Sequence, residues 1–362
     1  MIRKILLALA VLTAAAVAAV WWFTRPLPVL TVTSWAGPYG QAQDRAMMRP
    51  FASAKRVDTR LALWDGELKD IAEAVRTRTY KGDVIDFELP RAVEACRRGL
   101  LEKIDAADLP PGGDGTPAAR DFVPGAIGPC WIGSIVYSQV IVAAPHRFEV
   151  PPRTLADFFD TARFPGRRAL SRASPKFNLE MALLADGVAP ADVYRTLSTP
   201  EGLDRAFARL AALHPVWAHD NRDALERVRN GQAVMASALN GDVFDARRDF
   251  QPDVIWDRQL YELDVFGIPK GDPRKDRAMD FIRFATATLP LARTASWLPY
   301  GPARRSAWNQ VGQNPDLKIA MAPFQPTAHF DTAFAVDDGW WQDHLAQLMP
   351  RWQAFVMAQD GG

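Results

Sequence analysis

Carboxylates and aromatic rings, two side-chain types that can do chemistry, occur together in a short stretch late in the chain. Residues 256–271 (WDRQLYELDVFGIPKG) hold Asp257, Glu262 and Asp264 among aromatic side chains. Such carboxylates can be catalytic, can bind a cation, or can be solvated loop charges. The net charge of +1 over 362 residues gives no global bias that would explain them. Their role therefore has to be decided from the rest of the sequence.

The sequence contains none of the common catalytic templates. It has no Gly-x-Ser-x-Gly elbow, no His-Glu-x-x-His helix, no phosphate-binding glycine-rich loop and no Cys-x-x-Cys pair. His214 and His219 are five residues apart, which is poor spacing for one helical face. Paired acids could serve a glycosidase, but no feature singles out an acid and its partner. The sequence favours a binding protein that needs no metal and no cofactor.

Acids beside aromatic rings suit the recognition of a protonated amine. Carboxylates form charge-assisted hydrogen bonds with ammonium groups, and aromatic faces add cation–π attraction of roughly 0.5–2 kcal/mol. For each acid the structural alternative is a solvated charge or a helix cap, and for each ring it is core packing. Glu180, for example, would also favour the N-terminus of a helix. The candidate ligand-binding residues are Trp35, Tyr39, Glu88, Glu180, Trp217, Asp242, Asp257, Tyr261, Asp264 and Tyr300.

Helix and strand patterns alternate along the chain and would position these residues. The clearest patterns are strands at 29–35, 83–88 and 233–239, and helices at 68–80, 199–215, 221–231 and 276–289. This alternation predicts a mainly parallel sheet with helices on its faces and ligands at the carboxyl ends of the strands. Trp35 and Glu88 lie at such ends.

Two long apolar runs divide the chain. The run 132–146 (IGSIVYSQVIVAAPH) is longer than one buried strand needs, and a new set of α/β elements follows it. A second run, 263–271 (LDVFGIPKG), crosses back. The sequence predicts two α/β lobes joined by two extended crossings, with 29–138 plus 265–362 as the first lobe and 139–264 as the second. The segment 110–117 (PPGGDGTP) is typical of a flexible surface loop.

Residues 1–28 are predicted to form an export segment. The start, MIRK, carries two positive charges and precedes a 19-residue apolar run at 5–23. Small residues around Ala16 permit cleavage, but the run is also long enough to span a bilayer uncleaved. The segment is therefore a signal peptide or a signal anchor, and either alternative exports the rest of the chain.

The export segment bears on the two cysteines, Cys96 and Cys130. Outside the cytoplasm a lone cysteine pair usually forms a disulfide. The alternative is two buried free thiols.

The exported chain resembles the periplasmic solute-binding proteins of ABC importers, in the branch that takes up spermidine and putrescine. The similar segments include 33–43 (TSWAGPYGQAQ), 121–138 (DFVPGAIGPCWIGSIVYS), 238–246 (ALNGDVFDA) and 264–273 (DVFGIPKGDP). The resemblance implies a two-lobe periplasmic-binding-protein fold of type II, with the ligand in the cleft between lobes joined by a two-crossing hinge. It also implies a periplasmic location, a small organic cation such as a polyamine as ligand, and the permease subunits of an ABC importer as partners. We expect a monomer that binds no nucleic acid.

The resemblance also transfers roles to single residues. The motifs SWAGPY and LPYG match segments whose rings line the cleft in the family, and here these rings are Trp35, Tyr39 and Tyr300. The motifs NLEMA, NGDVFDA and DVF match segments whose acids recognise the amine, and here these acids are Glu180, Asp242 and Asp264.

Other residues receive a weaker role or a structural one. Asp257 is only a weak additional candidate, and Glu262 is expected to be a solvated loop charge. Cys96 and Cys130 fall where many relatives have a cysteine pair, so the resemblance implies the disulfide.

One departure from the family pattern concerns the ligand. The branch has tryptophan just before the NG motif, where this chain has Leu239. One wall of the amine site is therefore altered. An opine or another amine-bearing solute is the alternative ligand, and an exported hydrolase is the alternative from a different class of protein.

Overall fold

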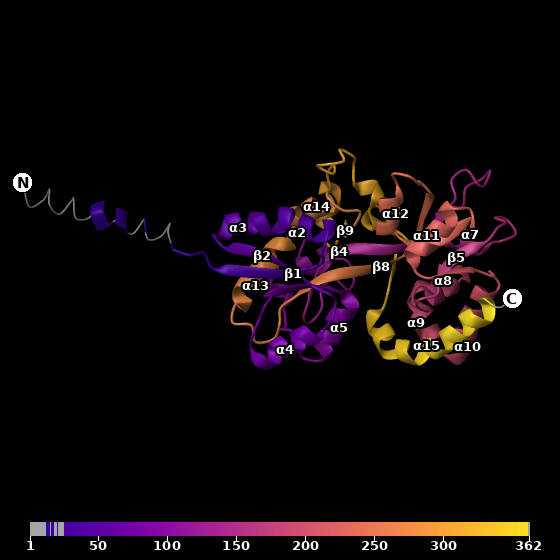
Figure 1. Ribbon diagram of the computed structural model, residues 1–362, viewed down its shortest axis with the longest axis horizontal. Helices are drawn as coiled ribbons and strands as arrows, with labels where there is room; N and C mark the ends of the chain where they lie inside the picture. The colour runs from indigo at the N-terminus through magenta and orange to yellow at the C-terminus, as the bar shows by residue number, and fades with distance from the viewer. Residues whose placement is uncertain (1–11, 15, 18–19, 21–24, 361–362) are drawn as a thin grey trace, which may run out of the picture.

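The computed structural model describes residues 12–14, 16–17, 20 and 25–360. The predicted export segment, 1–28, lies largely outside these residues. Over the described ranges no helix is both long enough and apolar enough to cross a membrane. The rest of the chain forms two α/β lobes that lie side by side (Figure 1).

A single sheet runs through both lobes. In the described part of the chain its strand order is β2-β1-β3-β8-β4-β7-β5-β6, with β10 on β8 and β9 on β4. The strands are β1 Val29–Ser34, β2 Asp58–Leu63, β3 Val84–Glu88, β4 Ile132–Ala143, β5 Arg168–Ser171, β6 Val216–Ala218, β7 Met235–Leu239, β8 Asp253–Gly267, β9 Gly301–Pro302 and β10 Phe334–Ala335. The two ends of the sheet are parallel, as the alternating pattern predicts.

The centre of the sheet is antiparallel and joins the lobes. Strands β4 and β8 pair over almost their whole length, from Ile132 opposite Phe266 to Ala143 opposite Asp253. Because the chain leaves the first lobe along β4 and returns along β8, these neighbours run in opposite directions. Figure 1 shows both strands passing between the lobes. The prediction of two extended crossings is therefore confirmed.

Helices cover the faces of the sheet. In the first lobe they are α2 Pro38–Gln43, α3 Arg49–Lys55, α4 Lys69–Thr77, α5 Leu89–Arg97, α6 Ala118–Asp121, α13 Lys275–Ala285 and α14 Thr288–Ala295, with a π-helical turn at Asp44–Met48. In the second they are α7 Leu155–Phe159, α8 Asn178–Ala185, α9 Val193–Leu197, α10 Pro200–Ala211, α11 Asn221–Arg229, α12 Asn240–Ala246 and α15 Asp338–Asp360. Helix α7 starts at a capping box, in which the side chains of Thr154 and Asp157 each accept a bond from the other's backbone N–H, at 3.2 and 2.9 Å.

The C-terminal helix α15 packs in the second lobe, although the sequence assigned 265–362 to the first. Trp341 and Trp352 of α15 are buried in the same hydrophobic core as Leu179 of α8. The Trp352 ring is fully buried, and its Nε1 donates to the carbonyl of Arg172 at 2.8 Å. Since β10 pairs with β8 just before this helix, the chain crosses between the lobes a third time, in addition to the two crossings that the sequence predicted. The aromatic side chains of α15 pack against the hydrophobic core of the second lobe and are buried there.

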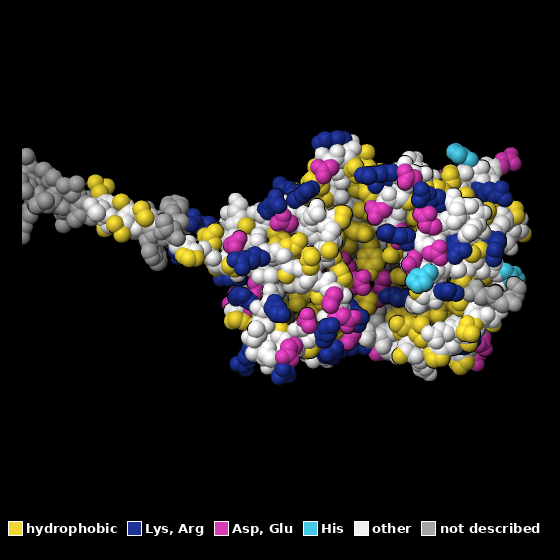
Figure 2. All heavy atoms as spheres, in the orientation of Figure 1, with side chains coloured by type: hydrophobic (Ala, Val, Ile, Leu, Met, Phe, Trp, Pro, Cys, Tyr) yellow, Lys and Arg dark blue, Asp and Glu magenta, His cyan; other side chains and the backbone are white. Residues whose placement is uncertain are grey.

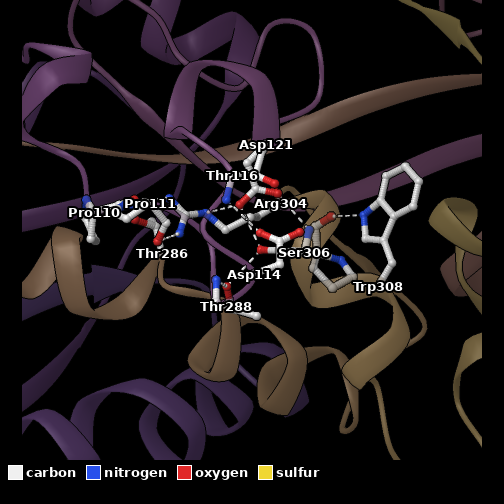
Figure 3. Close-up of polar contacts among 12 residues, drawn as sticks. Pro110, Pro111, Asp114, Thr116, Asp121, Thr286, Thr288, Arg304, Ser306 and Trp308 are labelled. Carbon is white, nitrogen blue, oxygen red and sulfur yellow. Dashed lines mark hydrogen bonds and ion pairs between the residues drawn. The ribbon is translucent and has the colours of Figure 1, made fainter.

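The segment 110–117 is fastened to the first lobe instead of forming a free loop (Figure 3). The buried guanidinium of Arg304 donates to two backbone carbonyls of this segment, at 2.8 and 3.2 Å, and lies 3.3 Å from the Asp121 carboxylate. Asp121 also accepts bonds from the backbone and hydroxyl of Ser306. The glycine- and proline-rich composition of this segment predicted flexibility. The sequence could not show the contacts with Arg304, because Arg304 is more than 190 residues away.

The two cysteines are joined. Cys96 at the end of α5 and Cys130 just before β4 form a disulfide with an Sγ–Sγ distance of 2.06 Å. The two residues are 34 positions apart, and the bond lies within the first lobe. The predicted disulfide is confirmed.

Candidate functional site

A cleft of about 250 Å³ lies between the lobes. We call it the interlobe cleft. Figure 2 shows a hollow between the two halves of the molecule, with acidic side chains beside it. A larger hollow of about 600 Å³ beside α12 is lined mainly by apolar side chains and two arginines, and none of its described lining residues is acidic. The residues that line the interlobe cleft come from both lobes and both crossing strands: Trp35, Tyr39, Glu88, Ile135, Tyr137, Leu239, Asn240, Gly241, Asp242, Asp264 and Tyr300.

The sheet places four carboxylates on one face next to the cleft. Glu88 on β3 is directly opposite Asp264 on β8, so the two side chains share a face. Asp86 and Glu262 are each two residues away along the same strands and point to that face too. We call Asp86, Glu88, Glu262 and Asp264 the acid ladder. The strand register thus concentrates negative charge where the lobes meet.

Asp86, Glu262 and Asp264 of the ladder are buried, and the pKa values of Asp86 and Asp264 reflect both burial and the nearby like charges. Asp86 accepts hydrogen bonds from Ser34 Oγ at 3.0 Å and Gln43 Nε2 at 2.7 Å. Burial raises the pKa of Asp86 to about 7 against these bonds, and the Glu88 charge adds to the rise. Burial, and then the charges of Asp86 and Glu88, raise the pKa of Asp264 well above its ordinary value. A bound cation would oppose both effects and favour the ionised carboxylates.

Three polar atoms at the cleft wall are buried without a hydrogen bond of ordinary geometry. Trp35 Nε1, Tyr39 Oη and Asp264 Oδ1 form no hydrogen bond of ordinary geometry with any described residue. Buried polar side-chain atoms in native proteins are nearly always bonded. Burial, followed by the charges of Asp86 and Asp264, raises the pKa of the Tyr39 hydroxyl well above its ordinary value, so this group stays protonated and can donate. The Tyr39 hydroxyl is thus a neighbour of the Asp86 and Asp264 carboxylates at this wall.

The opposite wall of the cleft includes Asp242, which is paired with an arginine that is not itself among the described lining residues. Asp242, in the first turn of α12, lines the cleft and accepts bonds from Arg222 Nη2 at 2.7 Å and Nε at 3.1 Å. The Arg222 side chain is 69% exposed, whereas that of Asp242 is 15% exposed. Arg222 was not predicted from the sequence, because nothing distinguishes it from the other arginines of α11. Only the fold brings it to Asp242.

Glu262 is not a solvated loop charge, and that prediction is wrong. It lies within β8, is 6% exposed, and forms an ion pair with Lys176. Tyr137, which lines the cleft, donates its hydroxyl to Glu262 at 3.2 Å. Lys176 also pairs with Asp338 at 2.7 Å. The sequence reasoning missed Tyr137 and Lys176, because each is more than 80 residues away from Glu262 in the chain.

The family model for bacterial extracellular solute-binding proteins matches residues 56–319. The chain belongs to this family. Over 330 residues, 90% of each chain, this solute-binding protein is 32% identical to the gamma-aminobutyric acid-binding protein of Pseudomonas aeruginosa. The solved structure of a GABA receptor matches at 26% identity with a TM-score of 0.71, over 90% of this chain and 97% of the other. The binding protein MotA from A. tumefaciens, solved in complex with glucopine, matches at 24% identity with a TM-score of 0.67, over 90% and 99%.

These comparisons confirm the two-lobe periplasmic-binding-protein fold and the solute-binding family. They do not extend to the polyamine branch, since the three relatives above are named for GABA or for an opine. The cleft of this solute-binding protein nevertheless gathers most of the residues predicted from the sequence. Leu239 also lines it, together with Trp35, Tyr39, Glu88, Asp242, Asp264 and Tyr300.

Two of the predicted residues are buried inside the second lobe of this solute-binding protein. Glu180 is fully buried and accepts bonds from Trp341 Nε1 at 2.5 Å and Tyr194 Oη at 3.1 Å. Trp217 packs edge-on against Trp352, with ring centroids 5.3 Å apart. Glu180 Oε2 and Trp217 Nε1 form no hydrogen bond of ordinary geometry with the described residues, but neither side chain is among those that line the described cleft.

Two more of the predicted residues bond to the backbone away from the cleft. Asp257 accepts from Leu155 N at 3.0 Å. Tyr261 is buried, and its hydroxyl donates to Pro124 O at 3.3 Å. Both belong to β8, the strand that also carries Asp264, so residue type and nearness in sequence did not distinguish them from a cleft residue.

Proposed function

We propose that this protein is the periplasmic substrate-binding component of an ABC importer and binds a small amine-bearing solute in the interlobe cleft. The best candidate is an ω-amino acid such as GABA, which carries an ammonium group at one end and a carboxylate at the other. The observation that carries the proposal is that the buried Asp264 carboxylate lines one wall of the cleft, while Asp242, which is paired with Arg222, lines the other.

The ammonium end of the ligand would bind the acid ladder. Asp264 lines the cleft, and Glu88, which also lines it, lies opposite on the neighbouring strand. Charge-assisted hydrogen bonds to Asp264 would be strong because this carboxylate is largely removed from water. The rings of Tyr39 and Tyr300 meet edge to face, with centroids 6.1 Å apart, and would cover the methylenes of the ligand.

The carboxylate end would bind Arg222. A guanidinium has five N–H donors, so Arg222 can keep Asp242 and still donate to a second carboxylate. Arg222 and Asp242 belong to the second lobe, whereas Glu88, Trp35 and Tyr39 belong to the first. A ligand that bonds both walls would favour the closed arrangement of the lobes by its differential affinity for that state. An opine also combines an amine with carboxylates and would use both walls in the same way.

A polyamine is the second candidate, favoured by the number of acids in the ladder. One ammonium group of a polyamine would bind Asp264 and Glu88 in the same way as the ammonium group of an amino acid. Its far ammonium, however, would face Arg222, and like charges in a partly buried site repel. We therefore rank an ω-amino acid first.

Thermal unfolding with a ligand panel tests the proposal. The panel is GABA, 5-aminovalerate, putrescine, spermidine, an opine and a neutral sugar, each with the purified protein. A ligand present at 100 times its Kd adds about 2.7 kcal/mol of stability. The ω-amino acids should raise Tm most, and recovery of the ligand unchanged would exclude a hydrolase. A shift with the neutral sugar and none with any amine would contradict the proposal.

A further inference from the structure

Lys176 is a buried cation close to the interlobe cleft, on the loop between β5 and α8. Its side chain is only 14% exposed and is paired with Glu262 and Asp338. Lysine is almost never buried without such partners. Burial by itself would lower the pKa of Lys176, but the charges of Glu262 and Asp338 outweigh it and raise the pKa above the ordinary value. The side chain is therefore held as an ammonium group.

The Lys176 ammonium occupies one end of the acid ladder. Glu262 and Asp264 are two residues apart on one face of β8, about 6.7 Å along the strand at the usual rise per residue. Asp264 lines the cleft. Glu262 accepts a hydrogen bond from the hydroxyl of Tyr137, and Tyr137 lines the cleft too. These charges also act on Glu88, which lines the cleft. Burial and then the charge of Glu262 raise the pKa of Glu88, and the charge of Lys176 opposes this rise.

The two carboxylates of β8 are thus spaced like the two ammonium groups of an extended four-carbon diamine, but one of them is already paired. We propose that Lys176 is a specificity-determining residue, whose ammonium fills the second cation position of the acid ladder and restricts the cleft to ligands with one ammonium group. This inference rests on the proposed amine site. It explains how a ladder of four acids can serve a monoamine: a tethered ammonium takes the position that a diamine would need, and repels a second cation.

The backbone holds Lys176 in this position. The next residue, Phe177, has φ of 69°, which bulky side chains rarely adopt. Lys176 Nζ lies 5.5 Å from the centroid of the Phe177 ring. A strained turn that persists next to a buried ion pair indicates that the surrounding contacts determine the conformation.

Calorimetric titration with two amines of equal chain length tests the role of Lys176. The probes are putrescine, with two ammonium groups, and n-butylamine, with one; GABA is titrated alongside. In the wild type, putrescine should bind no tighter than n-butylamine. In Lys176→Met, putrescine affinity should rise by at least about tenfold, whereas n-butylamine affinity should change by less than about threefold, because a new charge pair forms only with the diamine.

Two further variants make the result specific. Lys176→Met combined with Glu262→Gln removes the freed carboxylate and should abolish the gain. Lys270→Met removes a lysine from an exposed ion pair, with Glu102 at 2.9 Å, and should change the affinity for neither amine. If Lys176→Met does not fold, Lys176→Met combined with Asp338→Asn leaves fewer unpaired acids, and the same gain for putrescine is expected.

Three outcomes would overturn the proposal. One is a wild type that binds putrescine ten times more tightly than n-butylamine, which needs no variant to measure. The second is a folded Lys176→Met variant that binds both amines more tightly by the same factor. The third is a folded Lys176→Met variant whose affinity for neither amine rises. Failure of the proposed function would look different, because wild-type protein would then not bind GABA, whatever the comparison of the two amines shows.

Discussion

Glu88 on β3 and Asp264 on β8 are directly opposed in the sheet, so two carboxylates of like charge share one face at the meeting of the lobes. The pKa of each is raised, in both cases mainly by burial. Like charges placed directly opposite one another in a sheet are destabilising. An arrangement that costs stability in the empty protein becomes favourable when a cation is bound between the charges.

Asp264→Asn should weaken binding of the ligand with little harm to the fold. The variant keeps the shape and removes the charge, and loss of one partner from a buried charge pair typically costs about 2–5 kcal/mol. Affinity for GABA should therefore fall by at least about thirtyfold. The stability of the empty protein should stay the same or rise, since one of the repelling charges is gone. Calorimetric titration and urea denaturation measure the two quantities.

Glu149→Gln is the matched control for Asp264→Asn. Glu149 is an exposed acid in the loop before α7. We expect no change in affinity or stability. Equal and small effects at both positions would mean that Asp264 does not contact the ligand.

Arg222→Gln should lower the affinity only for ligands that carry a carboxylate. If Arg222 binds the carboxylate of GABA, the variant loses a charge-assisted bond and affinity for GABA falls by about tenfold or more. Affinity for n-butylamine, which has no carboxylate, should not fall. Arg229→Gln on the same helix, where Arg229 pairs with Glu226 at 3.3 Å, is the control and should leave both ligands unaffected. A parallel loss for both ligands would argue that Arg222 acts through Asp242 alone.

Glu180 should make the empty protein less stable as pH rises. Burial raises the pKa of Glu180 to about 7, against bonds from Trp341 and Tyr194. Because the folded state holds this proton more tightly than the unfolded state, the contribution of Glu180 is fully present below about pH 4.5 and is lost as pH rises through about 7. Glu180→Gln keeps an acceptor for Trp341 and cannot ionise, so its stability relative to wild type should increase by up to about 3 kcal/mol over this interval.

Urea denaturation at pH 4.5, 6 and 8 measures this difference. The pKa of Asp86 is raised to about 7 as well, by burial first, and this acid contributes to the same interval in both proteins. The comparison of variant with wild type cancels that contribution. A difference that is independent of pH would show that Glu180 does not titrate in this range.

Loss of the disulfide should lower the stability of the first lobe. In the chain-entropy model, a closed loop of this length contributes about 3–4 kcal/mol. Cys96→Ser combined with Cys130→Ser should lower the free energy of unfolding by a similar amount without changing ligand affinity, since neither cysteine is among the described lining residues of the interlobe cleft. The intact mass of the wild type should rise by about two daltons on reduction, as two thiols form in place of the bond. Ready alkylation of both cysteines in native, unreduced protein would contradict the bond.

Local patterns were sufficient for the elements and for part of the site. The strand at 29–35, the long runs that became β4 and β8, and the helix that starts at Pro200 follow from periodicity, caps and turn residues within a few positions. Trp35 and Glu88 could be placed near the cleft because the carboxyl ends of parallel strands converge. Asp264 followed from the resemblance of its motif.

The charges around Asp264 were decided by the tertiary structure. Asp264 and Glu262 are two residues apart and both are acids, yet one lines the cleft and the other is paired with Lys176. Lys176 is 86 residues from Glu262 in the chain. No local pattern indicates which distant cation reaches which acid, because electrostatic partners are set by strand register and lobe packing.

Contacts between residues far apart in sequence also explain the other differences between the prediction and the structure. The sequence by itself determined two α/β lobes and two crossings, since these depend on the order of elements, and its resemblance to a known family implied the disulfide and an acidic, aromatic cleft. Only the tertiary structure decided that Glu180 is a buried acid bonded to Trp341, that Arg222 joins Asp242, and that α15 packs in the second lobe. Each of these depends on contacts between residues far apart in sequence, whose free energy is gained only once the lobes have folded.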